Sequence, residues 1–273
     1  MKKMDDEYTR ILQLDNLKEL FECEKGYVDQ EDCSWYHSNW MLLRYLGVVS
    51  NPFWHENFYH NVINKYTNNQ TKVLVLGTAD FSMPYLCQLE GIDDITICDI
   101  CKTPLNICKC TAAYHGFSWK TEQKNIFDGI NGKYDVVIND AFITRFEYEK
   151  KKTVLNHIWD TLKDDGIYIT TMRHDWNGGE ALAPSISEKY DFVQKVIHRA
   201  EEKSIDITKA RNAAEQYIDK MKSYPVKNSQ MISDFISGKF FVEFFEEDSV
   251  EGECVETQYY RIVLRKCHEK YSN

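Results

Sequence analysis

The chain has 273 residues, 43% of them apolar, which is enough for one domain with additions around a packed core. Its 33 basic and 43 acidic residues give a formal net charge of -10, which argues against duplex nucleic acid or an anionic membrane as a general partner and favours a small molecule or a protein. Because the start of the chain lacks a secretory apolar stretch, no run of about 18 apolar residues occurs and the nine cysteines are an odd number, we expect a cytoplasmic protein with reduced thiols.

The amino-terminal part of the chain is predicted to be helical. Apolar residues recur at helical spacing between charges over residues 5–22, which predicts an amphipathic helix. The polar segment of residues 24–34 is predicted to be a linker or turn. We expect residues 1–69 to form a helical, aromatic-rich cap on a domain made of residues 70–273.

Residues 35–66 carry an unusual number of aromatic side chains and are interrupted by Pro52, so we expect one helix that ends near Val49 and another that begins at about residue 53. The rings can bury these helices against the rest of the fold, or they can form a lid over a ligand. In a lid, His37, Asn39 and Arg44 would supply polar anchors, and Arg44 could reach a carboxylate of the ligand. Any rings left exposed could form a homodimer surface.

A buried parallel strand is predicted at residues 72–76, because five mostly branched apolar residues end at a glycine. The small and capping residues that follow predict a tight turn into a helix over residues 82–90, with Ser82 as its N-cap. Backbone N–H groups converge at the carboxyl end of such a strand, where a nucleotide-like ligand binds in open parallel sheets. We therefore expect the ligand at a turn made of four residues: Gly77, Thr78, Ala79 and Asp80.

The next predicted strand covers residues 94–99 and ends on an acid. Asp99 lies at about the 20-residue distance from Gly77 at which a second parallel strand delivers a carboxylate to a ribose. We place the nucleoside beside Asp99 and Ile100. A glycine turn with such an acid is shared by NAD-binding and S-adenosylmethionine-binding folds, so this pattern alone predicts a nucleoside and does not choose between them.

A helix is predicted from about residue 103 to Gly116. Four cysteines in and beside this segment raise zinc as a hypothesis: Cys98, Cys101, Cys108 and Cys110. Their spacing argues against it, because Cys108 and Cys110 face different directions on a helix and Cys98 should point into the sheet. We therefore expect free cysteines and no bound metal.

Polar residues follow the third and fourth predicted strands. Asn125 and Ile126 come directly after a strand over residues 119–123, where they could hydrogen-bond to and pack on an adenine, although an asparagine at a strand end is also ordinary in a loop. The fourth strand is more apolar, and hence more central, and it ends on Asn139 and Asp140 at the same edge of the sheet.

The remaining elements are predicted in this order: a helix over residues 147–163, a turn at 164–166, a strand over 167–172 followed by Arg173 and His174, helices over 187–202 and 207–221, and strands over 240–245 and 257–265. The acidic residues 246–256 are predicted to connect the last two strands. Five strand–helix units followed by an antiparallel pair do not suit a standard NAD-binding fold.

This order resembles that of class I S-adenosylmethionine-dependent methyltransferases, in a divergent bacterial branch, over roughly residues 70–266. Residues 73–80 are similar to the glycine-rich first motif of the family, Asp99 falls at its ribose-binding position, and Asn125 with Ile126 resembles its adenine-binding position. The resemblance implies a Rossmann-like, seven-stranded, mostly parallel sheet with helices on both faces and an antiparallel last strand. Because the sheet begins only at Lys72 and its crevice needs a cover that excludes water, we also expect the amino-terminal helices to form a lid.

The resemblance also implies S-adenosyl-L-methionine as the cofactor and S-adenosyl-L-homocysteine as the product. The sequence departs from the family pattern at three positions: the second and third glycines of the first motif are Ala79 and Phe81, and the acidic residue inside the first strand is Val75. Ala79 still permits close approach of the backbone, whereas Phe81 must point away from the ligand or pack on it.

The leading hypothesis is methyl transfer to a small-molecule acceptor, with no nucleic acid or membrane partner. Direct displacement at the sulfonium methyl requires an in-line acceptor, a positioning pocket and a route for one proton. The candidates for handling the acceptor are Asn139, Asp140, Tyr36, His37, Arg173 and His174, with Asn139 also able to bind the cofactor. Two other hypotheses remain: attack at another carbon of the sulfonium, giving aminocarboxypropyl transfer or a cyclic amino acid, and a non-catalytic nucleoside-binding module.

Overall fold

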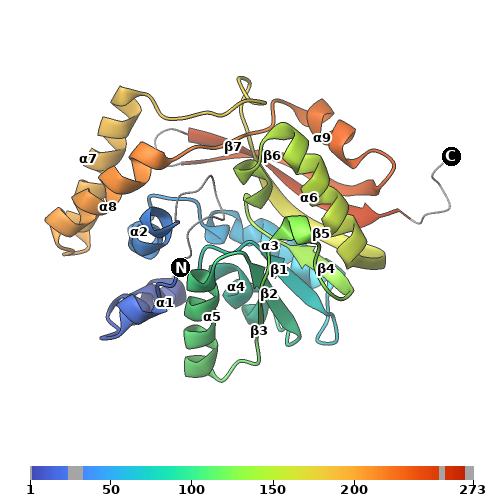
Figure 1. Ribbon diagram of the computed structural model, residues 1–273, viewed down its shortest axis with the longest axis horizontal. Coiled ribbons are helices and arrows are strands. Elements are labelled where there is room, and N and C mark those ends of the chain that lie inside the picture. The colour runs from blue at the N-terminus through green and yellow to red at the C-terminus, as the bar shows by residue number, and fades with distance from the viewer. Residues whose placement is uncertain (1, 24–32, 252–255, 268–273) are drawn as a thin grey trace.

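The computed structural model describes residues 2–23, 33–251 and 256–267 (Figure 1). Its centre is a seven-stranded sheet with the order β3-β2-β1-β4-β5-β7-β6. The strands have these bounds: β1 Val73–Leu76, β2 Ile95–Asp99, β3 Lys120–Gln123, β4 Tyr134–Ile138, β5 Leu162–His174, β6 Phe240–Glu251 and β7 Glu256–Lys266. The first five strands pair in parallel, and β7 is antiparallel to both of its neighbours, β5 and β6. The predicted fold class is therefore confirmed.

The position of each strand in the sheet follows from its pattern of apolar residues. All four residues of β1 are buried, because β1 lies between β2 and β4 and has helices on both of its faces. At the edge of the sheet, β3 has only exposed and half-buried residues. No helix in the described parts of the chain is long and apolar enough to cross a membrane.

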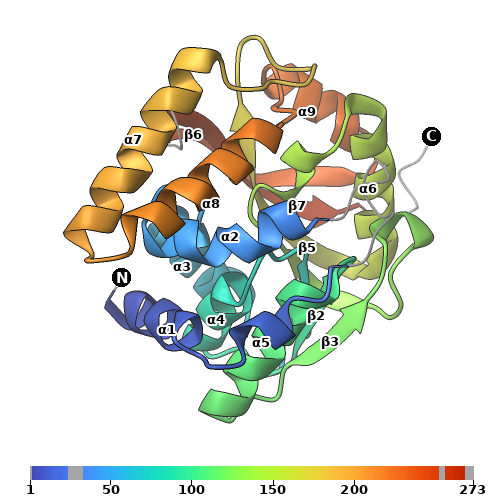
Figure 2. The same ribbon diagram turned by 60° about the vertical axis from the view of Figure 1, so that its left-hand side comes forward.

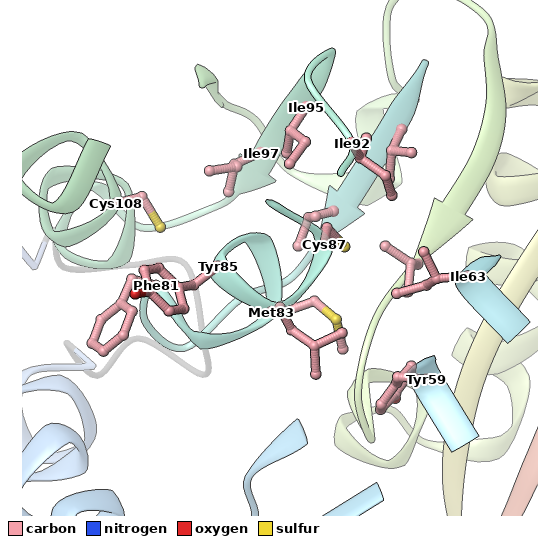
Figure 3. Close-up of a cluster of buried hydrophobic side chains, with 14 of the residues drawn as sticks. Tyr59, Ile63, Phe81, Met83, Tyr85, Cys87, Ile92, Ile95, Ile97 and Cys108 are labelled. Atoms are coloured by element: carbon pink, nitrogen blue, oxygen red, sulfur yellow. The ribbon is translucent and has the colours of Figure 1, made fainter. Parts of the chain in front are cut away.

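Two helical layers cover the sheet. One face carries α3 (Glu56–Tyr66), α4 (Ser82–Leu89) and α5 (Lys102–His115), and the other carries α6 (Tyr148–Thr161) and α9 (Ser229–Ile236). On the first face, side chains of α3 and α4 meet those of the strands: Tyr59, Ile63, Met83, Cys87, Ile95 and Ile97 (Figure 3). These interdigitating apolar side chains hold the strand ends, and hence the site, in fixed positions.

A third cluster of helices lies at one side of the sheet, and from here on this cluster, rather than residues 1–69, is called the cap. It joins α2 (Ser34–Tyr45) to α7 (Ile186–Glu202) and α8 (Ile207–Lys220), which come from the far end of the chain (Figures 1 and 2). Its core is aromatic and aliphatic: Trp40, Leu43, Phe192, Val196, Ala213 and Tyr217. The predicted division at residue 69 remains a prediction, but the packing shows that the amino-terminal helices do not form the cap alone.

The amino-terminal helices differ from the predictions in their lengths. The single helix expected over residues 5–22 is two pieces, α1 (Lys2–Leu12) and η1 (Leu17–Leu20), and α2 ends at Tyr45 rather than near Val49. Gly47, with φ of +71°, turns the chain just after α2. The next helical segment is split as well, into η2 (Pro52–His55) and α3. Of the predicted linker, residues 24–32 lie outside the described residues, and Ser34 already belongs to α2.

Four further corrections concern α4 and the elements after β4. The acidic segment predicted to connect the last strands is largely strand, since β6 runs on to Glu251. Arg261 on β7 pairs with Glu246 and Asp248 across the ladder, which compensates these two acidic residues. β5 begins at Leu162, so residues 164–166 belong to a strand rather than to a turn, and α9 was not predicted. The N-cap of α4 is Phe81, not Ser82.

Candidate functional site

A cavity of about 670 Å³ opens at the carboxyl ends of the central strands. Its walls come from the turn after β1, the end of β2, the segments after β3 and β4, α2, and residues 217–224 at the end of α8. This is the crevice at which open parallel sheets bind their ligands. The structure therefore brings the predicted strand ends and one helix of the cap to a common site.

The turn after β1 requires glycine. Gly77 has φ of +67°, and a Cβ built on it would lie 2.1 Å from the ring of Phe142, which follows β4. Thr78 and Ala79 line the cavity next to it. The aromatic ring after β4 therefore packs directly on the backbone of the predicted ligand turn, and no side chain fits between them.

Asp80 is buried beneath this turn and does not line the cavity. Its Oδ1 accepts a hydrogen bond from the backbone N–H of Ser82 at 2.8 Å and forms an ion pair with Nη1 of Arg44 at 2.6 Å. The Nε of Arg44 donates to the carbonyl of Ser50 at 2.9 Å. Burial by itself would lower the pKa of Arg44, but the attraction of Asp80, with smaller contributions from other acidic groups, outweighs burial and raises that pKa. Arg44 lines the cavity, yet two of its three nitrogens hold the protein's own groups in place.

Asp99 lines the cavity at the end of β2, as predicted, together with Ile100. Its Oδ1 accepts a hydrogen bond from the backbone N–H of Cys101 at 2.8 Å, which fixes the carboxylate over the start of α5. Burial raises the pKa of Asp99 to about 7. The carboxyl group is thus oriented by the chain and half-buried in the cavity wall.

Asn125 and Ile126 also reach the cavity. The side-chain oxygen of Asn125 accepts a hydrogen bond from the backbone N–H of Phe127 at 3.1 Å, which caps the short helix η3 (Ile126–Asp128). Ile126 is buried against the second face of the sheet. The predicted adenine position is therefore a rigid corner rather than a free loop.

Asp140 is the best-oriented carboxylate after β4. Its Oδ1 accepts hydrogen bonds from the hydroxyl of Tyr59 at 2.9 Å and from Thr171 Oγ1 at 2.7 Å, and its Oδ2 accepts from Ser50 at 3.3 Å. Asn139 lines the cavity as well, but its side chain is buried and bonds to Tyr168 and Thr170 within the sheet. Of these two neighbours, only Asp140 has a side chain that is partly exposed at the cavity.

The other predicted acceptor residues divide between the cavity and the far side of the sheet. Tyr36, His37 and Arg173 line the cavity, and the ring of Tyr36 stacks on Trp40 with centroids 4.5 Å apart. His174 does not line it, because consecutive residues of β5 point to opposite faces; its Nε2 donates to the carbonyl of Lys227 at 2.9 Å. The structure brings the first three together and leaves His174 out.

Several residues of the site had no signal in the sequence. Tyr59 belongs to the aromatic-rich segment, but nothing distinguished it from its neighbours, and Tyr217 reaches the cavity only because α8 packs on α2. Lys151 is buried, and its Nζ donates to the carbonyls of Ile143, Phe146 and Tyr224. Burial lowers the pKa of Lys151 to about 7. This lysine ties the segment after β4 to the segment that returns from the cap.

Solved structures share this architecture at low sequence identity, although no protein-family model and no curated protein matches the sequence. The N-methyltransferase NodS from Bradyrhizobium japonicum, in complex with S-adenosyl-L-homocysteine, is 10% identical, with a TM-score of 0.53 over 86% of this chain and 100% of its own. A SAM-dependent methyltransferase from Methanosarcina mazei is 11% identical, with a TM-score of 0.55 over 76% and 98%. TehB from Haemophilus influenzae is 12% identical, with a TM-score of 0.51 over 83% and 66%, so that just under two thirds of its length is covered. This chain has the class I methyltransferase fold.

The methyltransferase fold accommodates the departures from the glycine-rich first motif. Ala79 stands in the cavity wall, where its single methyl group still allows a ligand to approach the backbone. Phe81 points away from the cavity, and its ring packs on Tyr8 with centroids 4.9 Å apart. Val75 is completely buried in β1. The large side chain therefore fills the core and does not obstruct the ligand turn.

Proposed function

We propose that the protein transfers a methyl group from S-adenosyl-L-methionine to a small-molecule acceptor. The observation that carries the proposal is the cavity at the carboxyl ends of β1, β2 and β4, in which the Gly77 turn and the carboxylate of Asp99 face the same space on a methyltransferase fold. Its volume of about 670 Å³ lies within the range of small-molecule sites, about 300–1,000 Å³.

The cofactor takes its place along the strand ends. Asp99 accepts hydrogen bonds from the ribose hydroxyls, Asn125 and Ile126 bracket the adenine, and the backbone of residues 77–79 meets the methionyl part. The backbone of Asn139 forms a polar part of the cavity wall. Arg44 holds the turn from below through its ion pair with Asp80. Because its Nη1 and Nε already bond to Asp80 and Ser50, it cannot offer all of its donors to the cofactor carboxylate.

The acceptor lies between the sulfonium and α2. Asp140, oriented by Tyr59 and Thr171, takes the proton that the acceptor releases. The stacked rings of Tyr36 and Trp40 form the opposite wall. Positive charge disperses as the methyl group moves, and an aromatic wall that excludes water suits such a transition state.

Product analysis tests this proposal. The protein is incubated with S-adenosylmethionine, first alone and then with panels of amine, hydroxyl and thiol acceptors. Methyl transfer releases S-adenosylhomocysteine, and it does so only when an acceptor is present. Aminocarboxypropyl transfer and cyclisation both release methylthioadenosine. Release of methylthioadenosine, or tight binding without any turnover across the panels, would replace methyl transfer by one of the other two hypotheses.

At pH 8.5, where Asp99 with its pKa of about 7 is ionised, replacing it with alanine should weaken the binding of S-adenosylhomocysteine by about 1.5–3 kcal/mol, the range for hydrogen bonds to a charged group. Isothermal titration calorimetry measures the change. Asp128→Ala is the matched control, because it removes the same charge from an exposed residue that does not line the cavity. Equal affinities in both variants would place the ribose elsewhere, and binding of NAD with neither sulfur nucleoside bound would contradict the choice of cofactor.

A further inference from the structure

Four metal-ligating side chains converge beside the cavity, from parts of the chain far apart in sequence. Cys23 follows η1, Cys33 and His37 stand at the start of α2, and Cys101 is the N-cap residue of α5. The Sγ of Cys101 lies 3.5 Å from that of Cys33 and 3.8 Å from that of Cys23, and Cys23 Sγ lies 3.4 Å from His37 Nδ1. All four donor atoms lie within 4.8 Å of one another.

We propose that Cys23, Cys33, His37 and Cys101 bind a structural zinc ion. Zinc–sulfur bonds of about 2.3 Å and zinc–nitrogen bonds of about 2.0–2.1 Å in a tetrahedron place two sulfurs about 3.8 Å apart and a sulfur and a nitrogen about 3.6 Å apart. The three separations given above fall within a few tenths of an ångström of these edges. The other three separations are at most 4.8 Å, so the four donors need to close by no more than about 1 Å to surround a zinc ion.

The donor set favours zinc over a disulfide. A disulfide between Cys33 and Cys101 would use two of the thiols, but it would not explain why the Cys23 thiol and the His37 imidazole lie beside them. Three thiolates and one imidazole nitrogen are a regular ligand set for structural zinc. Four protein ligands also close the coordination sphere, so the ion has no open position for a substrate and its role is structural.

Contacts around the ligands support the same assignment. The hydroxyl oxygen of Thr103 accepts a hydrogen bond from the backbone N–H of Glu22 at 2.9 Å, so its own hydrogen can point to Cys23 Sγ at 3.2 Å. A hydrogen bond of this kind orients a metal-bound sulfur and stabilises its negative charge. His37 is buried, so its ring is held in place by packing.

The expectation of no metal came from the cysteines of residues 98–110 alone. In agreement with that argument, Cys98 and Cys108 point elsewhere, towards the carbonyls of Lys124 and Asp80. The sequence could not show that Cys101 meets three donors from the amino-terminal part of the chain. The proposal therefore replaces that expectation for Cys101 and keeps it for Cys98 and Cys108.

The zinc ion would connect the cap to the nucleoside site. Cys101 follows Asp99 by two residues, and Cys33, His37 and Cys101 all line the cavity. A metal at this point fixes the start of α2 against the end of β2. Removal of the ion should therefore loosen the cap and weaken the binding of S-adenosylhomocysteine, although zinc binding itself can be measured whether or not the proposed function is correct.

The first experiment measures metal content. The full chain, freed of any histidine tag and purified without chelator, is analysed by inductively coupled plasma mass spectrometry. We expect one zinc ion per chain, and a loss of at least nine tenths of it in Cys33→Ser and Cys101→Ser. Cys110→Ser is the matched control, because Cys110 is half-buried like Cys33 but lies outside the cluster, and it should retain the ion.

A second measurement remains informative if the serine variants fail to fold. Cobalt(II) added to the chelator-stripped wild type should give intense tetrahedral d–d bands and a thiolate-to-cobalt charge-transfer band. His37→Cys should still bind cobalt and shift the d–d bands, because a fourth thiolate replaces the imidazole. Three results would overturn the proposal. The first is folded wild-type protein that contains no zinc and does not bind cobalt, the second is a Cys33–Cys101 disulfide in place of the ion, and the third is full zinc content in both serine variants.

Discussion

Gly77→Ala should abolish the binding of S-adenosylhomocysteine to the folded protein and lower the free energy of unfolding by about 2–5 kcal/mol. Two costs add up. The left-handed backbone conformation costs an alanine about 1–2 kcal/mol, and forcing a methyl group into packed space typically costs about 1–3 kcal/mol. The new Cβ would lie 2.1 Å from the Phe142 ring, so the turn or the ring must move out of the cavity wall. Urea denaturation and calorimetry measure the two effects.

Gly47→Ala separates the two costs. Gly47 has nearly the same backbone conformation, with φ of +71°, but no atom lies within 4 Å of the position of its Cβ. It should lose only about 1–2 kcal/mol of stability and keep its affinity. In a Phe142→Ala background, Gly77→Ala should likewise lower the free energy of unfolding by little more than the cost of the left-handed backbone conformation. If Gly77→Ala behaved like Gly47→Ala, the ring would not be a fixed part of the site.

Arg44→Met should lower the free energy of unfolding by about 3–5 kcal/mol, the usual cost of removing one partner from a buried ion pair. Asp80 is completely inaccessible to solvent, so its carboxylate would remain buried without the guanidinium that lies 2.6 Å away. The same carboxylate accepts the Ser82 N–H at the start of α4, and the variant should therefore also bind S-adenosylhomocysteine more weakly. Urea denaturation followed by circular dichroism gives the stability.

Lys163→Met is the matched control for Arg44→Met. Lys163 forms an ion pair with Asp135 at a similar distance, 2.8 Å, but both side chains are well exposed. Its loss should cost no more than about 1 kcal/mol. Adding Asp80→Asn to Arg44→Met should recover part of the stability, because a neutral amide is less costly to bury than an unpaired charge. Equal destabilisation by the two methionine variants would mean that the Arg44–Asp80 pair does not hold the turn.

The sequence alone predicted the elements whose signals are local. The short apolar runs of β1 and β2 indicated parallel strands. The helix α5 lies within a residue or so of its predicted bounds because Gly116 adopts the left-handed conformation that ends a helix. Gly77 and Asp99 lie in the cavity wall at the strand ends where the sequence placed them, and their binding roles stay predictions. Each of these signals depends on residues a few positions apart.

The sequence interpretation did not establish on which face of the sheet the polar residues at the end of the fifth strand lie. Arg173 and His174 were both candidates because they follow the fifth predicted strand, but β5 continues through them and so sends them to opposite faces. The length of β5 decided the outcome. That length depends on its pairing with β7, more than 80 residues later in the chain, and not on the local composition.

Only the tertiary structure decided which distant side chains meet. The Arg44–Asp80 ion pair, the Tyr59–Asp140 hydrogen bond and the sulfur contact of Cys23 with Cys101 join residues 36, 81 and 78 positions apart. The packing of α2 on α8, which closes the cavity, spans a still longer stretch of chain. Local periodicity determines which face of an element is buried. The partner of that face is set by the order of the strands in the sheet and by the packing of helices on it, and these exist only in the folded chain.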